Sequence, residues 1–158
     1  MNLFWLNIFC ILLLLRVVFE SFGCWFLYLF AVYALEGRAL VFFDSTGFGF
    51  VVVDGKKHGD LLVVGGRVVE RELDVVKREF GTSHAVRESE VALLYKGKPE
   101  FILVGNGQDG VLEVDERFFE AAKRVGAQVT VLPTPKAILE FNLLSRNRRV
   151  NALIHVTC

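Results

Sequence analysis

The chain has 158 residues, enough for one domain, and its 18 lysine and arginine residues balance its 18 aspartate and glutamate residues. This balance excludes the basic global field that attracts nucleic acid, so we predict no nucleic-acid partner. Its three cysteines are too few and too unevenly placed for a disulfide framework.

The chain divides near Glu36 into an apolar first segment, residues 1–36, and a domain of ordinary composition, residues 42–158. Residues 17–35 are long enough to span the hydrocarbon core as a transmembrane anchor. The alternatives are a secretory signal and a misplaced translation start, the latter because Met1 is the chain's single methionine. We therefore expect a cytoplasmic domain, which is anchored to a membrane only if residues 17–35 are a genuine part of the protein.

A small antiparallel unit is predicted at the start of the domain. Residues 48–55 have the aromatic and β-branched composition of a strand and end in an Asp-Gly turn. A second apolar run, residues 60–64, is joined to residues 67–72 by Gly65-Gly66, a two-residue connection suited to a tight hairpin.

The pattern then alternates between helix and strand. The predicted helices are residues 88–97, 115–126 and 134–146, and the predicted strands are residues 100–105, 127–133 and 150–157. The middle helix has Asp115 and Gly126 as caps, and the last has Thr134 as its cap with Pro135 at the first helical position. The apolar stripe of the middle helix is predicted to be Phe118, Phe119, Ala122 and Val125. Because such crossovers imply parallel strands, we predict a three-layer α/β domain with a central mixed β-sheet, in which the N-terminal antiparallel hairpin unit precedes βαβαβ.

Glycines follow the first buried strand with the spacing G-x-G-x-x-G, at Gly105, Gly107 and Gly110. A dinucleotide-binding turn also needs a helix that begins within the motif and an acidic residue after the next strand, and both are missing. We therefore interpret residues 105–110 as a strand-exit loop at the carboxyl edge of the sheet and predict no cofactor. Anion binding by the backbone of this loop remains a hypothesis, with these candidate ligand-binding residues: Gly105, Asn106, Gly107, Gly110 and Thr134.

A second constellation contains the candidate catalytic residues Ser83, His84, His155 and Cys158. A Cys-His pair is typical of thiolate chemistry, and a serine beside a histidine suggests a hydroxyl nucleophile. However, His155 and Cys158 are three residues apart along a predicted strand, so they should point to opposite faces of the sheet. We therefore predict no metal site and a structural or capping role for residues 82–84.

Five segments occur in an order that is more specific than any one of them. They are GFVVVDGKKHGDLLVVGGRVV (49–69), REFGTSH (78–84), PEFILVGNGQDG (99–110), PTPKAILEFN (133–142) and RRVNALIHVTC (148–158). Together they resemble the small archaeal Mth-type domain family of unknown function. The same domain type is seen in mitochondrial complex I assembly factor three and in an adipogenesis-associated Mth-domain protein. The family's G-T-G loop corresponds to Gly105-Asn106-Gly107, its aromatic-Asn pair to Phe141-Asn142, and its arginine before the last strand to Arg149.

The resemblance covers residues 42–158 and implies a three-layer domain with a central mixed sheet. It implies no settled enzymatic activity and supplies no catalytic residues; family members with a known role act in assembly or interaction. We therefore expect a non-catalytic binding or assembly module with a protein partner. The alternative is a small-molecule or anion site, hydrolytic or redox in character, formed by residues 105–110, Thr134 and residues 81–84.

Overall fold

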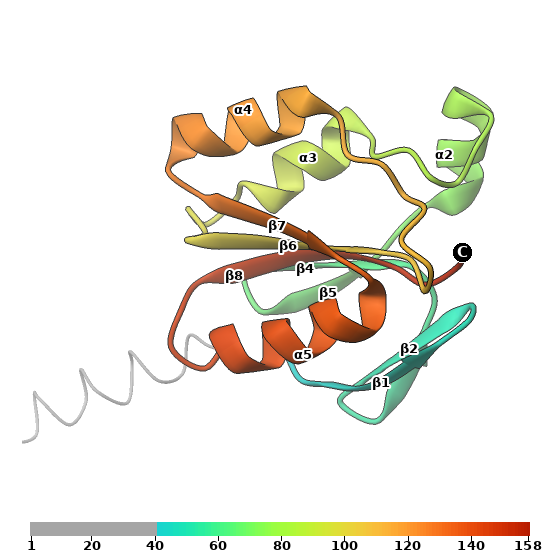
Figure 1. Cartoon of the computed structure of the whole chain (residues 1–158), viewed down its shortest axis with the longest axis horizontal. Helices are drawn as coiled ribbons and strands as arrows, with labels where there is room; N and C mark the ends of the chain where they lie inside the picture. The colour runs from blue at the N-terminus through green and yellow to red at the C-terminus, as the bar shows by residue number, and fades with distance from the viewer. Residues whose placement is uncertain (1–40) are drawn as a thin grey trace, which may run out of the picture. The chain divides into compact units, whose positions relative to one another are not determined.

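The computed structural model of the chain describes residues 41–158 (Figure 1), so the predicted anchor lies outside the described residues. Within residues 41–158 no helix is long and apolar enough to cross a membrane. The elements in chain order are β1 (Phe43–Gly47), β2 (Phe50–Val53), β3 (Lys56–His58), β4 (Leu61–Val64), β5 (Arg67–Glu70), α2 (Leu73–Phe80), α3 (Glu88–Leu94), β6 (Phe101–Asn106), α4 (Glu116–Val125), β7 (Gln128–Leu132), α5 (Thr134–Leu144) and β8 (Val150–His155).

The main sheet has five strands in the order β5-β4-β8-β6-β7. Strand β6 is parallel to both β7 and β8, whereas β4 is antiparallel to β5 and β8. Helices α3 and α4 cover one face of this sheet and α5 covers the other (Figure 1). The predicted mixed sheet, three layers and Gly65-Gly66 hairpin are confirmed, and both glycines have the positive φ values that such a turn needs, 57° and 76°.

Strand β8 lies at the centre of the sheet, and all six of its residues are buried. Its nearly continuous apolar sequence follows from this position, because both of its faces are covered by helices or by the small sheet. One core cluster, which includes Leu103 and Phe141, lies on the α5 side. The other, which includes Ile102 and Phe118, lies on the side of α3 and α4.

A separate three-stranded sheet, β1-β2-β3, packs beside α5, and sequence reasoning predicted only its middle strand. Strand β1 was missed because its sequence, FDSTG, is mostly polar. Phe43 holds it in place: this side chain is 2% exposed and meets the ring of Phe141 edge-on at 5.0 Å. Asn142 Oδ1 accepts from the Phe43 backbone N–H at 2.9 Å, and Asn142 Nδ2 donates to the Phe43 carbonyl at 2.7 Å. The Phe141-Asn142 pair therefore fastens the small sheet to α5.

We expect replacement of Asn142 by alanine to lower the free energy of unfolding by about 1–3 kcal/mol, because it leaves two backbone groups of Phe43 without partners. Urea denaturation measures the change, with Asn147→Ala at an exposed position as the control. An equal effect of the two substitutions would show that Asn142 does not fasten the sheet.

Several sequence predictions about the helices need correction. Helix α2 was not predicted; Val76 is its one buried residue, and its other apolar residues are partly or largely exposed. Helix α3 ends at Leu94, earlier than predicted. On α4, Phe118 and Ala122 are buried, whereas Val125 is 46% exposed and does not extend the apolar stripe.

The predicted caps of α4 are confirmed. Asp115 Oδ1 accepts from the Arg117 backbone N–H at 2.8 Å, and Gly126 ends the helix in the left-handed conformation at φ 74°. Thr134, in contrast, is not the cap of α5; Pro133 occupies that position and the threonine hydroxyl makes tertiary contacts.

The hydrogen bonds from the side chain and then the backbone of Arg117 lower the pKa of Asp115 to about 2. The ordinary value is 3.8, so the stabilisation from this carboxylate is complete above pH 3.8 and is lost as the pH falls toward 2. We expect a carbon-13 NMR titration of the carboxyl group to give a midpoint well below 3.8 in the native chain and a higher one in Arg117→Ala. The same midpoint in both proteins would contradict the assignment.

Candidate functional site

A buried ion network connects the start of β4, the segment after β5 and helix α3. The guanidinium of Arg71 donates to both carboxylate oxygens of Glu90, at 2.8 and 2.9 Å, and to Asp60 Oδ2 at 3.1 Å. It also donates to the Ala85 carbonyl at 2.8 Å. The side chain of Arg71 has no exposed surface, and its two carboxylate partners are 1% and 7% exposed. Burial of these charges is tolerated because every ion has a close partner of opposite charge.

The network continues into strand β8. His155 is fully buried, and its Nδ1 lies 2.5 Å from Asp60 Oδ2. The other oxygen of Asp60 accepts from the Val156 backbone N–H at 3.0 Å. Because a carboxylate only accepts, the proton of this hydrogen bond belongs to His155 Nδ1, and Nε2 is the ring nitrogen that faces away from Asp60. That Nε2 lies 3.0 Å from the Thr157 hydroxyl.

His84 and Cys158 lie next to this histidine. His84 Nε2 is 3.0 Å from Cys158 Sγ, and the rings of His84 and His155 meet edge-on with their centroids 5.2 Å apart. One nitrogen or sulfur atom from each of His84, His155 and Cys158 lies within 4.8 Å of the others. These three residues are called the His–Cys cluster below. The prediction that His155 and Cys158 point apart is wrong, because β8 ends at His155 and strand alternation does not extend to Cys158.

Thr82, two residues before His84, fixes the orientation of the His84 ring. Thr82 Oγ1 accepts from the His84 backbone N–H at 3.1 Å and lies 3.2 Å from His84 Nδ1. A structural or capping role was predicted for residues 82–84, and these contacts between Thr82 and His84 are of that kind. Ser83 is half-buried, and the hydrogen bonds found within residues 41–158 do not connect it to the His–Cys cluster.

Residues 105–110, called the glycine loop below, contact the residues that follow β8. Gly107 has φ 108°, and a Cβ there would lie 2.1 Å from the Cys158 carbonyl oxygen. The Asp109 N–H donates to the same oxygen at 2.9 Å. The Gly107 N–H donates to Thr134 Oγ1 at 3.1 Å, and Thr134 Oγ1 donates to the His155 carbonyl at 2.5 Å. Two of the N–H groups considered for anion binding are therefore used within the protein, and anion binding stays a prediction.

The remaining loop candidates have structural contacts. Asn106 Nδ2 donates to the Gly110 carbonyl at 3.1 Å, while Asn106 Oδ1 is buried without a hydrogen-bond partner among the described residues. A Cβ at Gly105 would lie 2.8 Å from Thr134 Oγ1, so this position requires a glycine. The loop lies next to the His–Cys cluster, as the alternative hypothesis of a small-ligand site requires. Asp60, Arg71 and Glu90 were not predicted.

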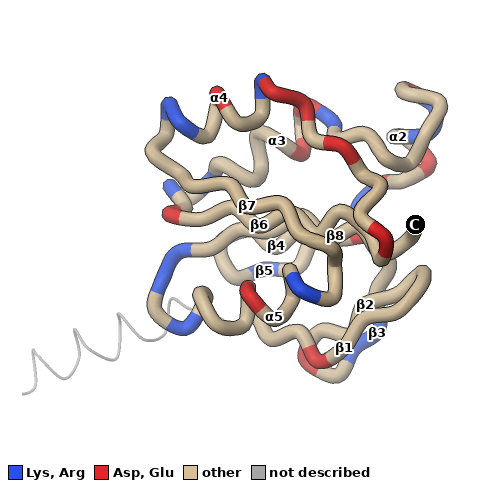
Figure 2. Tube along the Cα trace, in the orientation of Figure 1, with Lys and Arg blue, Asp and Glu red and all other residues tan. Residues whose placement is uncertain are grey.

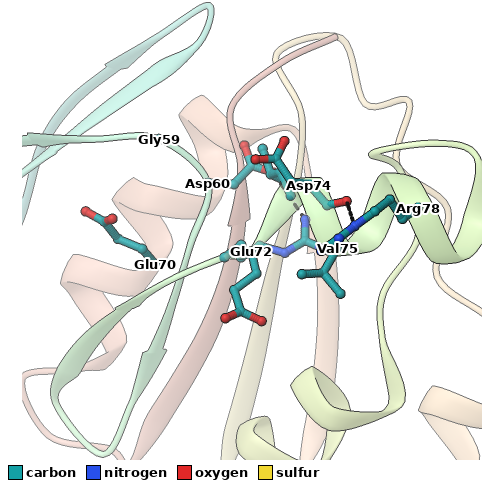
Figure 3. A pocket seen from close by; sticks show the side chains of 9 residues that line it. Gly59, Asp60, Glu70, Glu72, Asp74, Val75 and Arg78 are labelled. Carbon is teal, nitrogen blue, oxygen red and sulfur yellow. Dashed lines mark hydrogen bonds and ion pairs between the residues drawn. The ribbon is translucent and has the colours of Figure 1, made fainter.

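A charged cavity of about 490 Å³ opens beside the ion network, between the start of β4 and α2 (Figure 3). Its walls contain Glu70, Glu72 and Asp74 as well as Arg78, whose Nε donates to the Asp74 carbonyl at 3.2 Å. Glu72 is also paired with Arg87 at 3.2 Å. Most of the residues that line the cavity are charged, and the His–Cys cluster is not among them.

A second cavity, of about 570 Å³, is an apolar groove between α3 and the start of α4. It is called the α3–α4 groove below, and it is lined by Phe80, Ala85, Val86, Glu88, Val91, Glu113, Val114, Asp115, Arg117, Phe118 and Ala121. Acidic residues gather in the loop before α4 and at its first turn (Figure 2).

Comparison with known proteins identifies the family that has this architecture. The family described as "Protein of unknown function (DUF498/DUF598)" matches residues 43–155. The chain belongs to this family. A solved structure named MT938 is 38% identical, with a TM-score of 0.61, and the match covers 75% of this chain and 99% of that one. The conserved hypothetical protein PH1505 from Pyrococcus horikoshii is 29% identical, with a TM-score of 0.65 and coverage of 73% and 98%.

A protein from Bordetella pertussis, whose structure was solved by NMR, is described as a Mth938-like domain. It is 20% identical over 74% of this chain and 86% of its own, with a TM-score of 0.50, and it supports the fold alone. The chain is therefore a Mth938-like domain of unknown function, as the sequence resemblance indicated.

The positions that carry the resemblance have structural roles in this Mth938-like domain. Phe141 and Asn142 fasten β1 to α5, as described above. Arg149 Nε donates to the Lys98 carbonyl at 2.9 Å, and its guanidinium pairs with Glu100 at 3.2 Å. These contacts give the motif positions a role in folding.

Proposed function

We propose that this Mth938-like domain is a non-catalytic binding module that takes a partner protein segment in the α3–α4 groove. The segment has apolar side chains flanked by lysine or arginine. One observation carries this proposal: the groove combines an apolar floor with an acidic rim. An assembly role, which the family resemblance implies, is part of the proposal.

The floor of the groove is the outer surface of a core cluster. Val86, Val91 and Val114 are half-buried and pack against the cluster that contains Phe118. Phe80 at the rim is 51% exposed and adds an accessible aromatic surface to the groove. Apolar surface gathered in a groove of this size is typical of binding sites, because covering it with a partner removes it from water.

The charge of the groove's rim determines which residues are favoured on either side of the apolar part of the bound segment. Asp115 and Arg117 form an ion pair at 2.9 Å, so their charges offset one another. Within the described residues, Glu88 and Glu113 have no cation within 4.0 Å, although Glu88 contributes to raising the pKa of Arg117 after the larger effect of Asp115. The rim therefore presents two negative charges without a close partner, which favour lysine or arginine in the bound segment.

Two labelled peptides test the proposal by fluorescence anisotropy. They share a leucine- and valine-rich centre, but one has lysine flanks and the other glutamate flanks. We expect the full chain to bind the lysine peptide at least about tenfold more tightly, which corresponds to roughly 1.4 kcal/mol. Added salt should weaken this preference, since the rim is exposed.

Charge reversal locates the site. We expect Glu88→Lys and Glu113→Lys each to weaken binding of the lysine peptide severalfold, because both change rim positions. Glu120→Lys, on α4 but outside the groove lining, is the matched control and should bind as the native chain does. Equal affinity for both peptides, or equal losses in all three variants, would reject the groove as the binding site.

A second candidate function is binding of a small ligand at the carboxyl edge of the sheet. It is favoured by the convergence of the glycine loop, the 81–84 segment and Cys158. A ligand at about a hundredfold over its dissociation constant should stabilise the chain by about 2.7 kcal/mol. Melting temperatures measured with phosphates, nucleotides and divalent metals test this candidate, and an unchanged value throughout would exclude it.

A further inference from the structure

The His–Cys cluster contains donor atoms that transition metals prefer. Two imidazole nitrogens and one thiol sulfur come from three separate segments: the loop after α2, the end of β8 and the residues after β8. Imidazole together with thiolate is typical of zinc, cobalt and copper sites, whereas magnesium and calcium prefer oxygen.

The distances are close to those of a tetrahedral metal site. With zinc–sulfur bonds of about 2.3 Å and zinc–nitrogen bonds of about 2.0–2.1 Å, ligand atoms in a tetrahedron lie roughly 3.3–3.6 Å apart. His84 Nε2 and Cys158 Sγ are 3.0 Å apart, and the whole set lies within 4.8 Å. Cys158 is half-buried, so its side chain has more freedom to adjust than that of the fully buried His155.

Each imidazole is oriented by a partner on its other nitrogen. Asp60 accepts from His155 Nδ1, and Thr82 Oγ1 lies 3.2 Å from His84 Nδ1. Metal-binding histidines have this arrangement, because a partner on one nitrogen directs the lone pair of the other toward the metal. Asp60 is itself fixed by Arg71 and by the Val156 N–H, so the orientation of His155 is set before any ion binds.

We propose that His84, His155 and Cys158 bind one divalent transition-metal ion of the zinc type. His84 Nε2, His155 Nε2 and the Cys158 thiolate are the ligands, and the fourth position is taken by water or an external donor. His155 Nε2 exchanges its contact with the Thr157 hydroxyl, now at 3.0 Å, for the ion. The thiol releases its proton on binding, so the apparent affinity increases with pH. The proposal gives the second candidate function a ligand class and rests on it, but it does not depend on the α3–α4 groove.

Cobalt(II) titration of the full chain tests the proposal, in a background of Cys10→Ser and Cys24→Ser that removes the other two cysteines. Binding by Cys158 produces a thiolate-to-cobalt charge-transfer band in the near ultraviolet. We expect this band to saturate at one cobalt per chain and to disappear when zinc is added. Absence of the band would overturn the proposal.

Single substitutions in the background protein show which residues bind the metal ion. Cys158→Ser should abolish the band, and His84→Ala should weaken cobalt binding by more than the roughly 10–100-fold that loss of an outer partner costs. Thr82→Val removes such an outer partner and should fall within that range. His58→Ala, at a histidine outside the cluster, should bind as the background protein does. Retention of the band in Cys158→Ser, or an equal loss in His58→Ala, would contradict the assignment.

Circular dichroism is used to check that each variant is folded. His155→Ala is avoided because it would leave Asp60 buried without this partner. Melting temperatures of the same background protein are also measured with phosphate and with nucleotides. A shift with phosphate but none with cobalt or zinc would reject the metal while leaving the small-ligand site intact.

Discussion

We expect Arg71→Met to lower the free energy of unfolding by about 3–5 kcal/mol, because it leaves the buried carboxylates of Asp60 and Glu90 without their common cation. Methionine fills much of the space of the arginine side chain, so the loss reports the charges rather than a cavity. Urea denaturation near neutral pH measures the effect.

The matched control is Arg117→Met, at a side chain that is 87% exposed. Its ion pair with Asp115 lies at the surface of a single helix, so its removal should not disturb the core. A loss in Arg71→Met no larger than that of the control would mean that the network contributes little to stability.

The second large effect is expected at Gly107. An alanine Cβ would lie 2.1 Å from the Cys158 carbonyl oxygen and 2.5 Å from that of Thr157, at a φ of 108° that side chains rarely adopt. Strain and steric overlap together should destabilise the chain by about 2–5 kcal/mol or displace the residues that follow β8. Because Cys158 then moves away from His84, cobalt binding should also be lost.

Gly126→Ala separates these two causes. Gly126 also has a positive φ, 74°, but a Cβ there has open space around it. We expect Gly126→Ala to lower the free energy of unfolding by roughly 1–2 kcal/mol, from backbone strain alone. Equal stability losses at the two glycines, with cobalt binding retained in Gly107→Ala, would contradict the close contact with Cys158.

Much of the fold could be predicted because its signals are local. The caps of α4 at Asp115 and Gly126, and the apolar runs of β6 and β8, depend on residues near in sequence. Strand β1 could not be predicted in this way, since it is held by contacts to Phe141 and Asn142, which lie far along the chain from Phe43.

The candidate site was predicted in part. His84, His155 and Cys158 were named as candidate residues because imidazole and thiol groups are few in this chain, although no metal site was predicted. Asp60 and Arg71 were missed, because charged residues usually lie on the surface and their burial depends on pairing across the fold. The α3–α4 groove was also missed, since it arises only where the loop after α2 meets the start of α4.

The central claim is that this Mth938-like domain binds a partner segment in the α3–α4 groove. Amide NMR spectra of the isotope-labelled full chain, recorded during titration with the lysine-flanked peptide, test it most directly. We predict that the largest shift changes occur in residues 85–91 and 113–121, which form the groove. Changes concentrated instead on α5 and the β1–β3 sheet, or no changes at all, would contradict the claim.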